Sequence, residues 1–301
     1  MQIGIKPTVD IVFKKLFGSN DHKDLPLHFL NELLPLAGRE PVSSLTILNP
    51  YLIADFEGDK EVSLDLRLEE PDKRDIQVEM QVRSRGALDN RMLTTWSKLY
   101  TSQIGRGDSY ALHRPAISIW IIGEAHFGDG SWLHVFEAHC RRTGHTLSPN
   151  FLILTIELEV FSSLKKGPQW DSVSPGLRKW LTLLAEGETL DPEHLPETMA
   201  DADVREALQI MSTFKLQDRE RILYDSRQDY EWTRNAEMAE AIQEGMKEGM
   251  KEGMKEGEKK GRADGERAKA LSDARNFKRL GVSTAIIAEA TGLPETEVEE
   301  L

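Results

Sequence analysis

The sequence contains a single cysteine, Cys140, and no long apolar run. One cysteine excludes an intramolecular disulfide framework and a zinc site built from several thiolates. The run Ala116–Ile122 is far shorter than the about 20 apolar residues that a membrane-spanning helix needs. No apolar stretch follows Met1, so we expect no secretory signal and no membrane contact, and we place the protein in the cytoplasm.

Positive charge is also in the minority. The chain has 38 basic and 51 acidic residues, which give a formal net charge of -13 at pH 7. This balance argues against a generic basic coat protein for nucleic acid. It leaves room for a local nucleic-acid site, because a metal ion can face phosphate from an acidic surface. With 301 residues, of which 39% are hydrophobic, the chain can form one large domain or two small ones.

The sequence lacks the glycine-rich loops that bind phosphate in nucleotide-binding proteins. Its glycines gather in the C-terminal region, where no strand-like segment precedes them. Three histidines lie near Cys140, but the spacing of His134, His139 and His145 matches no standard metal-ligand pattern. A lone cysteine of this kind is usually a small buried residue rather than a nucleophile.

Residues 1–160 contain most of the strand-like sequence, interleaved with helical patterns. Apolar residues at helical spacing predict helices over 9–17, 25–34 and 89–104. Strands are predicted over 45–48, 61–69, 75–83, 116–122 and 151–160. The segment 116–122 is almost wholly apolar, which indicates burial on both faces, whereas 61–69, 75–83 and 151–160 alternate. This order of elements predicts a mixed α/β domain.

The two neighbouring alternating strands are joined by Glu70–Arg74, which has the composition of a turn. In a hairpin centred on Asp72, Asp65 would lie directly opposite Glu79, with Cβ atoms about 4.5–5.5 Å apart. Gln81 would share their face of the sheet. Two carboxylates this close repel one another unless a cation or a proton lies between them.

A carboxylate pair with a polar neighbour is a suitable Mg²⁺ site, because Mg²⁺ takes a few carboxylate oxygens and keeps positions for water and substrate phosphate. The alternative is that Asp65 and Glu79 are ordinary charges on the solvent-exposed face of a strand. The spacing alone leaves both interpretations open.

Three motifs in this order resemble the Rpn family of recombination-promoting nucleases, in the PD-(D/E)XK nuclease superfamily. They are Lys6–Gly18, Leu64–Arg67 and Ile76–Gln81. The helix around Trp96 and the glycine repeat near the C-terminus are also similar to that family. The resemblance implies a restriction-endonuclease-like core and metal-dependent hydrolysis of phosphodiester bonds in DNA.

The same resemblance implies roles for individual residues. Asp65 and Glu79 match the catalytic metal ligands, and Gln81 stands where the superfamily has lysine. An amide can position a water molecule, but it cannot deprotonate it. A metal ion can still generate hydroxide, because it lowers the pKa of bound water.

Further candidate residues lie around this motif. Asp10 matches an acidic residue of the family's first helix and is a candidate third metal ligand; as a first-turn acid it could equally stabilise the helix N-terminus. Tyr100 is a candidate for lining the site, with core packing as the alternative. Four basic residues are candidate contacts to DNA, although surface cations of this kind are common: Lys14, Arg83, Arg85 and Arg91.

The rest of the chain predicts three further parts. Residues 161–240 indicate a helical extension, and residues 268–301 a small helical module. Residues 241–267 repeat Glu-Gly-Met-Lys, and each glycine costs a helix about 1 kcal/mol against alanine. This segment is either a helix that forms on pairing with a copy of itself or on packing against another part of the chain, or it is a flexible charged linker. The last module resembles a helix-turn-helix, but its acidic final helix would be repelled by phosphate, which favours a protein contact.

The sequence therefore predicts a restriction-endonuclease-like α/β core, residues 1–160, followed by a helical extension and a glycine-repeat tail. We expect an Mg²⁺-dependent DNA endonuclease, with Mn²⁺ as a substitute, linked to recombination or transposition. We also expect a homo-oligomer, most simply a dimer, formed through the tail. The alternative is a catalytically weak DNA-associated assembly protein that kept the fold and oligomerises through the repeat.

Overall fold

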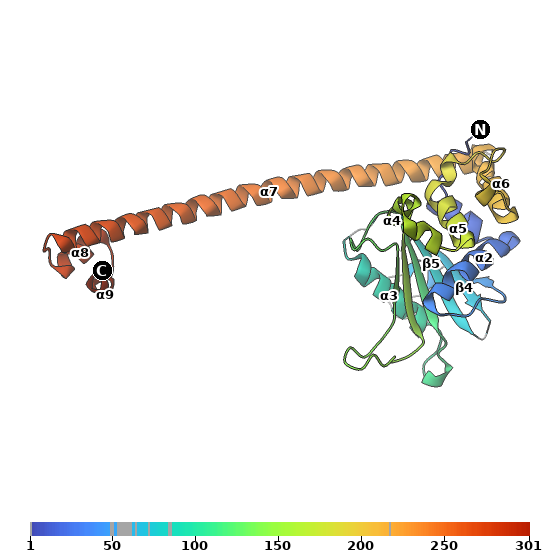
Figure 1. Cartoon of the computed structure of the whole chain (residues 1–301), viewed down its shortest axis with the longest axis horizontal. Helices are drawn as coiled ribbons and strands as arrows, with labels where there is room; N and C mark the ends of the chain where they lie inside the picture. The colour runs from blue at the N-terminus through green and yellow to red at the C-terminus, as the bar shows by residue number, and fades with distance from the viewer. Residues whose placement is uncertain are drawn as a thin grey trace. The chain divides into compact units, whose positions relative to one another are not determined.

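The computed structural model describes residues 2–48, 51–52, 62–63, 65–71, 73–83, 86–216 and 218–301. The chain divides into two compact units, Met1–Asp229 and Tyr230–Leu301 (Figure 1). The first unit contains a mixed α/β layer structure, in agreement with the predicted fold class, and the second is helical.

A six-stranded sheet, in the order β1-β4-β5-β6-β8-β7, forms the centre of the first unit. Its strands are β1 (Thr46–Leu48), β4 (Leu66–Glu70), β5 (Arg74–Gln81), β6 (Ala116–Ile122), β7 (Leu133–Phe136) and β8 (Phe151–Glu157). β2 (Tyr51–Leu52) and β3 (Val62–Ser63) form a separate short ladder. Strands β5, β6 and β8 are parallel, so their carboxyl ends meet at one edge of the sheet.

Helices cover both faces of this sheet (Figure 1). The larger apolar core joins one face to α1 (Asp10–Phe17), α2 (Asp24–Leu33), α4 (Leu158–Ser163), α5 (Pro175–Glu186) and α6 (Ala202–Leu216). A smaller core joins the other face to α3 (Leu88–Thr101). Short 3-10 turns connect the elements: Asn20–His22, Leu34–Ala37, Tyr110–Leu112, Leu164–Lys166, Pro168–Ser172, Gly187–Thr189 and Glu197–Met199.

Most predicted elements are present, but the expected exposure of one face of two strands, and the extent of the second of them, were wrong. β5 is buried on both faces because α3 covers its polar face. The predicted strand over 151–160 ends at Glu157, where α4 begins. It is buried on both faces because the larger core covers one face and the smaller core covers the other. In α3 the buried stripe runs through Met92 and Leu99, so Leu93 is 52% exposed. The short edge strand β7 was not predicted.

An aromatic cluster anchors the helices of the larger core. Phe17 packs between Phe13, Phe29 and Trp180, with ring centroids 5.0, 5.7 and 5.8 Å away. All four side chains are buried. These residues come from three helices, so the cluster ties α1, α2 and α5 together and holds α1 in a defined place on the sheet.

The second unit continues α7 (Asp218–Arg279) and adds α8 (Thr284–Thr291) and α9 (Glu295–Glu300). A small apolar core consists of Ala274, Ile287, Leu293 and Val298. The two turns use Gly281 and Gly292, which have φ of 81° and 69° and need the freedom of glycine. Among the described residues, no helix combines the length and apolar sequence needed to cross a membrane.

Replacing Phe17 with alanine should lower the free energy of unfolding by about 3–5 kcal/mol, because the cavity cannot be filled by its aromatic neighbours. Urea denaturation followed by tryptophan fluorescence measures this, since five of the six tryptophans precede residue 230. Leu93→Ala, at an exposed position of α3, is the control and should change the value by no more than about 0.5 kcal/mol. Equal effects of the two changes would contradict the assigned core.

Candidate metal and catalytic site

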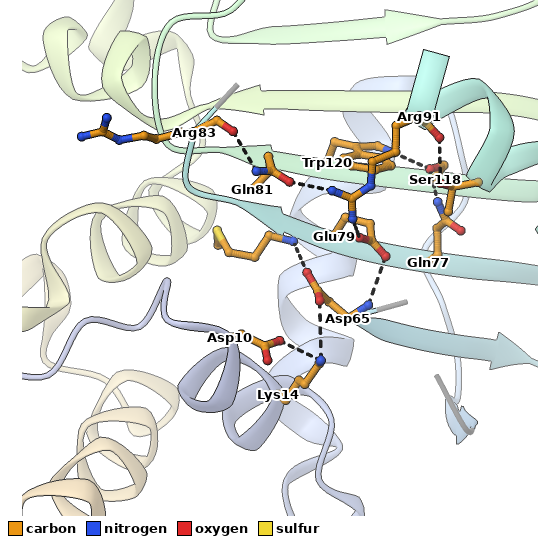
Figure 2. A network of polar contacts seen from close by, with 12 residues as sticks. Asp10, Lys14, Asp65, Gln77, Glu79, Gln81, Arg83, Arg91, Ser118 and Trp120 are labelled. Atoms are coloured by element: carbon orange, nitrogen blue, oxygen red, sulfur yellow. Dashed lines mark hydrogen bonds and ion pairs between the residues drawn. The ribbon is translucent and has the colours of Figure 1, made fainter. Parts of the chain in front are cut away.

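The hairpin of β4 and β5 has the register that the sequence predicted. Leu66 pairs with Val78 and Leu68 with Ile76. At the next position along the hairpin, the backbone amide of Asp65 donates a hydrogen bond of 3.0 Å to the Glu79 carboxylate. The backbone amide of Met80 donates one of 2.9 Å to the Asp65 carboxylate (Figure 2). The two acidic residues are therefore held side by side by the backbone of the hairpin itself.

Glu79 is withdrawn from solvent and Asp65 is partly buried. Glu79 is 1% exposed, so the interpretation of this residue as an ordinary exposed charge was wrong. Burial, together with the nearby Asp65 carboxylate, raises the pKa of Glu79 to about 8. Burial also raises the pKa of Asp65. A buried pair of this kind holds a proton or needs a cation beside it.

Helix α1 brings a third carboxylate and a cation to the pair. The Lys14 ammonium lies 2.7 Å from Asp10 and 3.6 Å from Asp65. Asp10 and Lys14 are one turn apart, so both project from the same side of α1 (Figure 2). Burial opposes the charge of Lys14, but the two carboxylates outweigh it and raise the pKa of Lys14.

Helix α3 supplies a second cation from the other face of the sheet. Arg91 lies 3.2 Å from the Glu79 carboxylate and donates a hydrogen bond of 2.9 Å to the side-chain oxygen of Gln81. Its guanidinium carbon is 5.3 Å from the centre of the Trp120 ring, a cation–π arrangement. The amide nitrogen of Gln81 donates to the carbonyl oxygen of Arg83 at 2.7 Å. Arg91 therefore fixes both Glu79 and Gln81 (Figure 2).

Beneath Arg91 lies a buried polar chain that sequence reasoning missed. The side-chain amide of Gln77 and the indole N–H of Trp120 both donate to the Ser118 hydroxyl, at 2.5 and 2.7 Å. All three residues are fully buried. Ser118 and Trp120 are the two residues of the apolar segment 116–122 whose side chains are not aliphatic. They are two residues apart, so the sequence already indicated that they lie on the same face of the strand.

The structure does not bring every predicted residue to this site. Tyr100 stacks on Trp96 and His113, with centroids 5.1 and 4.0 Å away, at the opposite end of α3 from Arg91. The side chain of Arg83 points away from the carboxylates, and only its carbonyl takes part (Figure 2). Arg85 lies outside the described residues.

The chemistry of the three carboxylate side chains is of the kind that a divalent metal ion uses. The carboxylates of Asp65 and Glu79, with Asp10 across from them on α1, offer hard oxygen ligands of the kind that Mg²⁺ prefers. Burial is the main cause of the raised pKa values of Asp65 and Glu79, and the nearby Lys14 and Arg91 offset it only in part.

Comparison with known proteins agrees with the geometry. A family described as PD-(D/E)XK nuclease family transposase matches residues 7–241, a range that contains α1, the β4–β5 hairpin and α3. Neither the curated proteins nor the solved structures contain a match to the chain. Because the matched range covers more than half of the sequence, the resemblance read from the three motifs is confirmed, and the chain belongs to the PD-(D/E)XK nuclease family transposases.

Proposed function

We propose that this protein is a metal-dependent DNA endonuclease that acts in recombination or transposition. The observation that carries the proposal is the pairing of Asp65 with Glu79, which are linked through the Asp65 backbone amide while Glu79 is withdrawn from solvent. Surface carboxylates do not need such an arrangement, whereas a metal site does.

The ligands in this proposal are Asp65 and Glu79, with Asp10 as the third. Mg²⁺ is the expected ion, and Mn²⁺ is a substitute with the same ligand preference. When bound, such an ion lowers the pKa of a water molecule and polarises the scissile phosphate. Nucleases of this superfamily typically use divalent metal ions, which supports the assignment.

Gln81 and two cations take the place of the missing lysine in this proposal. The Gln81 amide is oriented from both ends, by Arg91 and by the Arg83 carbonyl, so it can position a water but not accept its proton. Lys14 stays protonated beside Asp65 and supplies positive charge toward a phosphate. Arg91 supplies it from the opposite face of the sheet. Phosphate contacts by these two side chains would place the DNA without reading its sequence.

Carboxylates that point to opposite faces of the sheet would favour the competing idea of a catalytically weak assembly protein. The hydrogen bonds that each carboxylate accepts from the facing segment favour the nuclease instead. The assembly function remains compatible with it as a second property of the chain, located in α7.

We propose that α7 pairs with α7 of a second copy. Its repeat places Met246, Met250 and Met254 one turn apart with exposed fractions of 74, 73 and 71%. The neighbouring glycines at 245, 249 and 253 leave open space where another helix can approach closely. Lysines and glutamates fill the remaining positions of the repeat, so two copies can also pair opposite charges.

Asp65→Asn and Glu79→Gln should each lower Mg²⁺-dependent nicking of supercoiled plasmid by at least about 100-fold, because each removes one anionic ligand but keeps the side-chain shape. Asp171→Asn and Glu197→Gln, at exposed carboxylates of the same unit, are matched controls that should retain wild-type rates. Nicking by all five proteins at one rate would indicate a contaminating nuclease. Absence of nicking in every protein, across Mg²⁺ and Mn²⁺, would favour the assembly function.

Glu79→Gln should stabilise the metal-free protein, and more so as the pH rises. The pKa of folded Glu79, about 8, lies above its ordinary value of 4.5, so ionising Glu79 opposes folding. The wild type should therefore lose about 1.4 kcal/mol of folding free energy per pH unit between these two values, and the variant should lose less. Urea denaturation in EDTA at pH 5.5 and 8.5 measures the difference. A gap that does not change with pH would contradict the buried, titrating carboxyl group.

Replacing Met246, Met250 and Met254 together with glutamine should convert a dimer to a monomer, because it removes the apolar side chains of the proposed contact. Light scattering behind size exclusion should then give the 34.1 kDa mass of one chain instead of twice that value. Arg262→Gln with Glu266→Gln, an exposed ion pair further along α7, is the control and should keep the dimer. A wild-type protein of single-chain mass at all concentrations would refute pairing.

A further inference from the structure

A cleft of about 550 Å³ opens at the carboxyl ends of the three parallel strands. Its wall includes the residues that directly follow each strand: Val82 after β5, Gly123 after β6 and Leu158 after β8. The segment before α1 and the last turn of α5 complete it. Ligands of open α/β sheets bind at this kind of edge, because the chain turns there leave a crevice.

The cleft adjoins the carboxylate pair along two segments of the chain. Arg83, in its wall, lies two residues after Gln81, and the Gln81 side chain donates to its carbonyl at 2.7 Å. Thr8, also in the wall, lies two residues before Asp10. Two segments that carry site residues therefore enter the wall of the cleft within two residues of Asp10 and of Gln81, which places the cleft beside the site.

The charges in the wall do not suit a phosphate. Lys6 and Arg83 are outnumbered by Glu124, Glu159 and Glu188. Lys6 is moreover 3.9 Å from Glu188. Carboxylates instead accept hydrogen bonds from N–H groups.

Apolar side chains make up much of the remaining wall: Pro7, Val82, Leu158, Leu184 and Ala185. Apolar walls with a few hydrogen-bond acceptors are typical of pockets for small heterocycles, and the volume lies in the range of such pockets. A nucleobase has this chemistry, with flat apolar faces and N–H donors on its edge.

We propose that this cleft receives one nucleobase, turned out of the DNA, next to the phosphate held at the carboxylate pair. The inference rests on the proposed nuclease function and names its substrate class, which is DNA with an unpaired or easily unpaired base at the cleavage site. Such a base leaves the stack at the lowest energetic cost.

The test compares three duplexes of one sequence that carry, at a single position, a paired adenine, an unpaired adenine bulge or a bulged abasic residue. Binding to the full-length protein is measured by fluorescence anisotropy in Ca²⁺ without Mg²⁺, so that no cleavage rate enters the result. The adenine bulge should bind at least about tenfold more tightly than the abasic bulge, because only the former fills the cleft.

Two variants of α5 test whether the preference for the adenine bulge comes from this cleft. Ala185→Phe places a ring in the cleft and should abolish the preference for the adenine bulge over the abasic bulge. Thr182→Phe, three residues earlier on α5, lines a different cavity and should keep it. The wild-type comparison of the two bulges needs no variant, so the proposal stays testable if Ala185→Phe fails to fold.

Equal affinity of the wild type for the adenine and abasic bulges would overturn the base-binding cleft. Plasmid nicking that persists in that case would leave the nuclease function standing. Loss of the preference in Thr182→Phe as well as in Ala185→Phe would also overturn the assignment to this cleft. Failure to bind any of the three duplexes would overturn both the base-binding cleft and DNA as the substrate. In that case we expect plasmid nicking to be absent as well.

Discussion

The repulsion between two carboxylates on one hairpin is the constraint around which the first unit is arranged. Each carboxylate accepts a hydrogen bond from a backbone amide of the facing segment, so Asp65 and Glu79 can separate only by giving up these two bonds. The structure balances them with one cation from each helical layer, Lys14 from α1 and Arg91 from α3. The aromatic cluster around Phe17 positions α1, and Met92 and Leu88 position α3. The two apolar cores therefore hold the helices that carry the two cations of the site.

The absence of the third-position lysine changes how positive charge reaches this site. In the chain described here, Gln81 is a neutral group whose orientation depends on Arg91. Arg91 in turn rests against the buried Trp120 ring and touches Glu79. In the proposed site, positive charge beside the carboxylates comes from two neighbouring helices instead of from the strand that carries Glu79. This arrangement links the state of the carboxylates to the packing of α1 and α3 on the sheet.

Much of the fold could be predicted from local pattern. Strict alternation and a polar turn predicted the hairpin and its register, because a side-chain period of two and a fixed turn leave one pairing that buries the apolar face. The prediction failed where a distant element determined burial. The polar face of β5 looked exposed because its sequence is polar, but α3, which follows in the chain, covers it. Residue types alone do not show which face another helix will cover.

The sequence by itself determined the order of elements, the facing of Asp65 and Glu79, and the family, because these depend on spacing along the chain and on short motifs. Only the tertiary structure decided that Lys14 and Arg91 lie on the carboxylates, that Tyr100 lies at the far end of α3, and that Glu79 is withdrawn from water. These facts depend on how helices pack against the two faces of the sheet. That packing is set by the summed contacts of apolar residues far apart in sequence, which no local pattern contains.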